Sequence, residues 1–152
     1  MFQDLFKPHI HLGSFLIRLG LAGIFIFHGF LKLAQGGGAH WHLQLTEASQ
    51  LAVTWGELIC GFCLLFGLFS RVAVLPMIVI QVGAILFQTG HWDFINTDYI
   101  TPNPSYAPTG YEYNFALIMM CMAVLAIGSG KVSLDYLLFG AKESATPPAS
   151  GA

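Results

Sequence analysis

The chain has 152 residues, a length that suits a single domain. Only 9% of its residues are charged, against about 25% in soluble domains, and 55% are hydrophobic. This composition excludes an ordinary soluble protein. It predicts an integral membrane protein that is embedded in, and contacts, the lipid bilayer. The net charge of -2, with no cluster of Lys or Arg, gives no basis for binding nucleic acid.

Four apolar stretches follow one another, and each is long enough to cross the ~30 Å hydrocarbon core of a bilayer as a helix. We expect these helices at residues 12–33, 50–69, 72–89 and 111–128. A very short turn at Ser70-Arg71 makes the second and third an antiparallel hairpin. The first stretch is too long for the core of a signal peptide, so we expect it to stay in the mature protein.

The fold class expected from this pattern is all-α, a bundle of four transmembrane helices formed by residues 1–139. A short interfacial helix is expected at 130–139, and residues 140–152, rich in Ser, Thr and Pro, read as a disordered tail. Cationic residues concentrate on the side shared by the termini and the middle turn: Lys7, Arg71, Lys131 and Lys142. The positive-inside rule then predicts cytoplasmic termini, with the long loop 90–110 between helices three and four outside.

Glu57 lies well inside the second apolar stretch, where a charge costs ~2.5–3.5 kcal/mol on insertion scales. Such a residue normally faces the protein interior and has a partner. His28 lies at nearly the same depth in the first helix, within ~3 Å at helical rise. Lys32 follows four residues later on the same face. We therefore expect a buried polar network around Glu57 and His28, and we take these three residues as the candidate catalytic groups.

The other two helices also bring polar groups to this outer half of the bundle. Gln88 and His91 lie where the third helix ends, and Glu112 lies where the fourth begins. These residues are candidates for binding a cofactor or substrate. In the alternative interpretation, Lys32, His91 and Glu112 simply reach interfacial water from the helix ends.

Arg18 lies in the cytoplasmic half of the first helix, and three uses remain open for it. Its side chain snorkels to the cytoplasmic surface, pairs with Asp135, or holds an anionic ligand. We include it among the candidate binding residues.

The pattern Cys60-Gly61-Phe62-Cys63 looks like a redox motif, but it lies near the midplane in apolar surroundings. A working C-x-x-C usually begins a helix and has access to solvent. Small residues at helical spacing let helices approach closely, and helix packing explains this run of small residues better than redox chemistry does. The sequence has no haem, flavin or iron–sulfur motif, and we expect no metal site.

The chain resembles the DoxX family of small four-helix bacterial membrane proteins. The resemblance rests on Arg18-Leu19-Gly20 with His28-Gly29-Phe30-Leu31-Lys32-Leu33, on Glu57-Leu58 through Gly61 and Gly67-Leu68-Phe69-Ser70-Arg71, and on Gly128-Ser129-Gly130-Lys131-Val132-Ser133-Leu134-Asp135. It implies a multi-pass protein of the bacterial inner membrane with a redox association. The family takes its name from a subunit linked to quinone reduction with thiosulfate, and other members are tied to thiol and oxidative-stress handling.

Three functions stay open at this point. The first is a redox-linked oxidoreductase subunit that handles quinone or a small sulfur species, with electrons from a partner subunit or from substrate. The second is a non-catalytic accessory subunit of a larger membrane complex. The third is a small transporter or proton relay. Each involves a partner membrane protein or a homo-oligomer.

Overall fold

The computed structural model describes residues 9–40, 42, 45–87, 94 and 110–140. These residues form four α-helices and one short π-helix. The bounds are α2 Ile10–Ala34, α3 Glu47–Phe66, α4 Ser70–Phe87, α5 Glu112–Ile127 and η2 Tyr136–Gly140. The all-helical expectation is confirmed. Three of the helices, α2, α3 and α4, are long and apolar enough to cross a membrane, whereas α5 is a shorter apolar helix of 16 residues.

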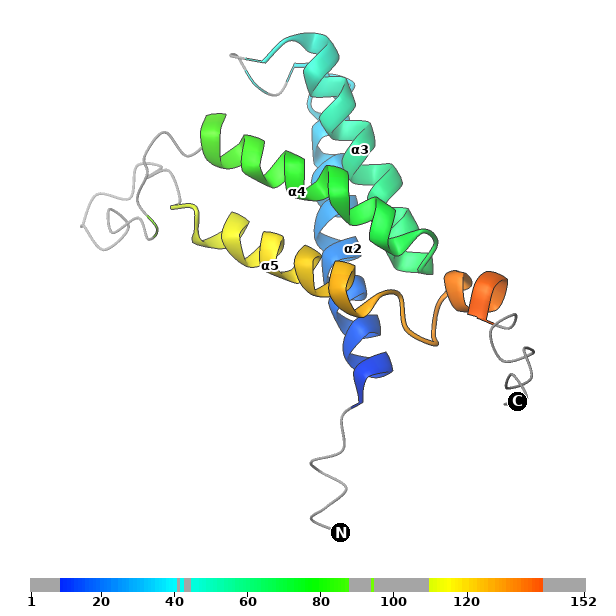
Figure 1. Ribbon diagram of the computed structural model, residues 1–152. Coiled ribbons are helices and arrows are strands. Elements are labelled where there is room, and N and C mark those ends of the chain that lie inside the picture. Colours follow the sequence, from blue (N-terminus) through cyan, green and yellow to red (C-terminus); the bar gives the residue numbers. More distant parts are fainter. Residues whose placement is uncertain (1–8, 41, 43–44, 88–93, 95–109, 141–152) are drawn as a thin grey trace, which may run out of the picture.

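The four α-helices pack in a ring. α2 packs against α3 and α5, and α4 packs against the same two helices. Figure 1 shows α4 and α5 side by side, crossing α2, with α3 joined to α4 by a short turn. We call the end with this turn the hairpin end and the opposite end, where α2 ends and α3 begins, the loop end. α3 and α4 separate toward the loop end (Figure 1).

The distribution of side chains suits a lipid environment. Several polar residues are buried, among them Arg18, Thr54, Glu57 and Gln81. Large apolar side chains are exposed along every α-helix, for example Val79 at 70%. Because lipid tails do not penalise exposed apolar surface while they do penalise unpaired polar groups, this arrangement is expected of a membrane protein.

The ends of α3 are set by local capping. Thr46 begins the helix, because its hydroxyl accepts from the Ser49 amide at 3.3 Å. Gly67 ends it in the left-handed conformation, with φ of 67°. The predicted turn at Ser70-Arg71 is therefore wrong by three residues, since the chain turns at 67–69 and Ser70 already begins α4.

The segment after α5 closes the hairpin end. The Asp135 carboxylate accepts from the backbone amides of Phe69 at 2.6 Å and Ser70 at 3.0 Å, so it caps α4 from a distant part of the chain. The Asp135 amide in turn donates to the Gly67 carbonyl at 2.9 Å. The helix predicted at 130–139 is shorter than expected, because residues 131–133 form a bend, helical structure starts at Leu134 and the π-helix covers Tyr136–Gly140.

Close contact between α2 and α3 depends on two glycines. A Cβ at Gly61 would lie 2.8 Å from Ile26 Cγ1 and 3.2 Å from the Ile26 amide nitrogen. A Cβ at Gly29 would lie 2.6 Å from Leu58 Cγ. Cys60 is buried in the apolar core beside these contacts, and it is a free thiol.

We predict that Gly61→Ala lowers the free energy of unfolding by about 1–3 kcal/mol, because α2 and α3 must move apart to fit the methyl group. Gly23→Ala in α2 is the matched control, since a Cβ there meets no atom within 4 Å. The control should be neutral or slightly stabilising, because alanine favours helix over glycine. Thermal melting in detergent measures the stability of both variants. Equal changes in stability for Gly61→Ala and Gly23→Ala would contradict the close contact.

Candidate functional site

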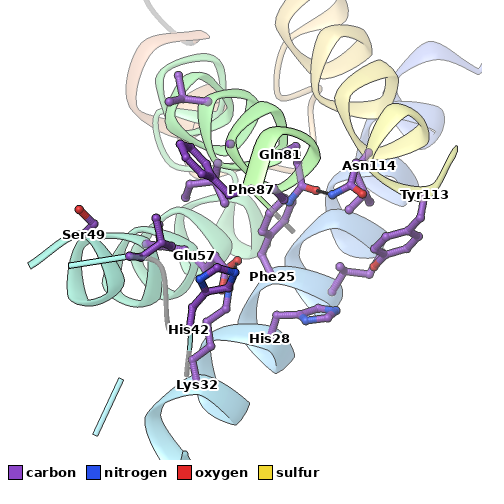
Figure 2. A pocket seen from close by; sticks show the side chains of 18 residues that line it. Phe25, His28, Lys32, His42, Ser49, Glu57, Gln81, Phe87, Tyr113 and Asn114 are labelled. Carbon is purple, nitrogen blue, oxygen red and sulfur yellow. Dashed lines mark hydrogen bonds and ion pairs between the residues drawn. The ribbon is translucent and has the colours of Figure 1, made fainter. Parts of the chain in front are cut away.

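A cavity of about 750 Å³ lies between the four helices toward the loop end. Its walls are mostly apolar, with Ile80, Ala84 and Phe87 contributed by α4 and Phe25 by α2. Polar side chains from all four α-helices also line it: His28, Lys32, Ser49, Glu57, Gln81, Tyr113 and Asn114, together with His42 from the loop (Figure 2). Such a cavity, apolar with a few convergent polar groups, is typical of a small-molecule site.

The partner of Glu57 is Lys32. The Lys32 Nζ donates to Glu57 Oε1 at 2.5 Å, and the two side chains are 18% and 4% exposed. The bond joins α2 to α3 at the side of the cavity. A charge-assisted hydrogen bond of this kind is strong when water is largely excluded. The interpretation of Lys32 as a residue that merely reaches interfacial water is therefore not supported.

His28 lines the same cavity but differs from the expectation in its burial. It is exposed, whereas Glu57 is buried. One turn of α2 separates His28 from Lys32, and Lys32 is the one that bonds to Glu57 of α3. Figure 2 shows the His28 ring on the same side of the cavity as Tyr113. The expected buried network is thus a Glu57–Lys32 pair, with His28 at the cavity wall.

The sequence analysis missed a second polar pair in the cavity. Asn114 Nδ2 donates to Gln81 Oε1 at 2.7 Å and joins α5 to α4 (Figure 2). Tyr113, the neighbour of Asn114, also lines the cavity. The sequence did contain a sign of this pair: Gln81 is an amide side chain inside an apolar helix, and such a group needs a hydrogen-bond partner in a membrane. Asn114 was the unrecognised partner.

Glu112 does not line the cavity, although it lies in the first turn of α5 beside two residues that do. Its amide donates to the Phe94 carbonyl at 3.1 Å, which ties the start of α5 to the preceding loop. Gln88 and His91, the other two candidates at this end, lie outside the described residues, as do loop positions 88–93 and 95–109 and the tail 141–152.

Arg18 lies apart from the cavity, near the hairpin end. Fourteen residues of α2 separate it from Lys32, which is about 21 Å along the helix. Its side chain is 1% exposed. The guanidinium donates to the Leu64 carbonyl at 2.9 Å and to the Val132 carbonyl. Arg18 therefore neither snorkels nor joins the candidate site; it holds the end of α3 and the segment after α5 together.

A family model described as DoxX matches residues 13–91, slightly more than half of the chain. The chain belongs to the DoxX family. The matched segment contains α2, α3 and α4, and with them the Lys32–Glu57 pair, whereas Tyr113 and Asn114 of α5 lie beyond it. No curated protein and no solved structure matches the chain. Family and apolar helices together identify a DoxX-family membrane protein.

Within residues 9–40, 42, 45–87, 94 and 110–140, no group of three or more His, Cys, Asp or Glu side chains is placed to hold a metal ion. Cys60 and Cys63 are free thiols on α3, and neither lines the cavity. The polar side chains that line the cavity can transfer protons, form hydrogen bonds and stabilise charge.

We predict that Lys32→Met and Glu57→Gln each destabilise the protein, with Lys32→Met costing about 3 kcal/mol because it leaves a buried carboxylate unpaired. The double variant should lose much less than the sum of the two, since it removes both charges. Denaturation in mixed detergent micelles gives the free energy of unfolding of the unmodified protein, the two single variants and the double variant. Additive losses would show that the pair does not couple α2 to α3.

We also predict that Arg18→Lys lowers the melting temperature, because an ammonium group cannot bridge the Leu64 and Val132 carbonyls as a planar guanidinium does. The expected decrease in the free energy of unfolding is about 1–3 kcal/mol. Arg71→Lys is the matched control, since Arg71 is exposed and makes one long bond of 3.3 Å to the Ala126 carbonyl. A control that loses as much as Arg18→Lys would contradict the assigned role.

Proposed function

We propose that this DoxX-family protein is a redox-linked subunit of a bacterial inner-membrane system, and that its cavity binds a quinone head group or a small sulfur species. The observation that carries the proposal is the cavity itself. Its volume of about 750 Å³ suits a substituted ring, and its apolar walls meet an ion pair and two amides at the same end.

In this proposal α5 is a fourth membrane span and both termini are cytoplasmic. Two features support the fourth span. α5 packs against α2 and α4, and its outer face exposes Phe115, Met119 and Met122, as a lipid-facing helix does. The positions of Arg71 and Lys131 at the hairpin end support a cytoplasmic hairpin end. The loop end, with the cavity, then faces the outer half of the membrane.

Each polar residue has a defined part in such a site. Reduction of a quinone to a quinol takes up two electrons and two protons, so it needs proton donors near the ring. The carboxyl group of Glu57 relays a proton, the His28 ring hydrogen-bonds a ring oxygen, and Lys32 stabilises negative charge on oxygen or sulfur. The electrons come from a partner redox subunit or from a thiol substrate that is oxidised to a disulfide.

The experiment is mass spectrometry of the protein purified in mild detergent, with its co-purifying lipids, quinones and proteins. We expect a retained quinone that is lost in Glu57→Gln and in His28→Ala. Glu47→Gln is the matched control, because it removes an exposed carboxylate from the first turn of the same helix, and Glu47 does not line the cavity.

The same preparation separates the alternatives. A stoichiometric partner protein without quinone would favour the accessory subunit over the redox-linked one. Ion flux in liposomes that disappears in Glu57→Gln, again without quinone, would favour the transporter. Either result would overturn the proposal that the cavity is a quinone site.

A further inference from the structure

The cavity reaches the outer surface of the bundle at the middle of α4. Val79 lines the cavity although its side chain is 70% exposed. It lies nine residues after Ser70, the first residue of α4, which is about 14 Å along a helix of about 27 Å. An opening at half the length of an apolar helix lies at the depth of lipid tails, well away from either end of the bundle.

The opening lies where α3 and α4 separate. At Gly56 the two helices are close, since a Cβ there would lie 3.4 Å from Ile80 Cδ1. Beyond this crossing they diverge toward the loop end (Figure 1). A Cβ at Gly83, one turn past Val79, would meet no atom within 4 Å, and Gly83 lines the cavity. The neighbouring exposed side chains of α4, Val82 and Leu86, are apolar.

A second observation concerns the polar end of the cavity. Glu57 Oε1 accepts from Lys32, whereas the buried Oε2 has no hydrogen-bond partner among the described residues. An ionised carboxylate can only accept hydrogen bonds. A buried acceptor without a partner is costly, so a ligand that donates to Oε2 is favoured over one that cannot.

We infer that the ligand is a lipid-soluble aromatic ring bearing hydroxyl groups, a quinol, which enters the cavity from the bilayer between α3 and α4 and donates a hydrogen bond to Glu57 Oε2. A quinone carries only acceptor oxygens and cannot make this bond. The inference rests on the proposed function and deepens it, because it names the form of the ligand that ionised Glu57 holds most tightly, the product of the proposed reduction, and the route between bilayer and cavity.

The test uses the full chain in mild detergent under argon. The probes are a decyl-substituted benzoquinol and its di-O-methyl ether, which has the same ring without donors. Affinity is measured from the dependence of the melting temperature on probe concentration. We expect the quinol to bind the unmodified protein about tenfold more tightly than the ether, as one hydrogen bond to a charged acceptor provides.

The route is tested with one pair of variants. Gly83→Leu should fill the opening and weaken quinol binding about tenfold or more. Gly23→Leu is the matched control, because Gly23 is an exposed helical glycine of α2 with the same open space and lies outside the cavity lining. The control should bind quinol as the unmodified protein does.

The outcomes distinguish this inference from the proposed function. Equal binding of quinol and ether, or equal loss in the two glycine variants, would overturn the inference while a quinone-type site remains. If the unmodified protein binds neither the quinol nor the corresponding quinone, the inference fails and so does the proposal of a quinone site. The comparison of the two probes needs no variant, so it stands even if Gly83→Leu does not fold.

Discussion

The bond between Lys32 and Glu57 is the interaction on which the loop end of the bundle depends. A carboxylate and an ammonium group at this depth are each unfavourable in a membrane, and together they neutralise one another. Their bond fixes the rotation of α2 relative to α3. The second oxygen of Glu57 is buried without a hydrogen-bond partner among the described residues, and Glu57 also lines the cavity. One side chain thus both joins two helices and contributes to the candidate site.

The two ends of the bundle satisfy their buried polar groups in different ways. At the hairpin end two nitrogens of Arg18 donate to backbone carbonyls, and the Asp135 carboxylate accepts from backbone amides of another segment. At the loop end polar side chains pair with one another, Lys32 with Glu57 and Asn114 with Gln81, around open space. The loop end is where polar side chains from all four α-helices converge on one apolar cavity, which gives it the character of a ligand site.

Hydropathy predicted the helices well, because apolar length alone determines where a chain can cross a bilayer. Their ends were less predictable, since the turn at 67–69 depends on the left-handed Gly67 and on a cap from distant Asp135. The depth of Glu57 correctly indicated a partner in α2. It did not decide between His28 and Lys32, because the two lie one turn apart on the same face of the helix. The partners of Arg18 are backbone carbonyls, which no residue type in the sequence reveals.

The contacts of Arg18 and Asp135 have a consequence for synthesis of the chain. Arg18 leaves the ribosome well before one of its carbonyl partners, Val132, which lies 114 residues later in the chain. The cap of α4 also waits for Asp135. Until these residues emerge, three apolar helices share the membrane with a partly unsatisfied guanidinium. The hairpin end is thus completed last, and insertion and final packing are separate events.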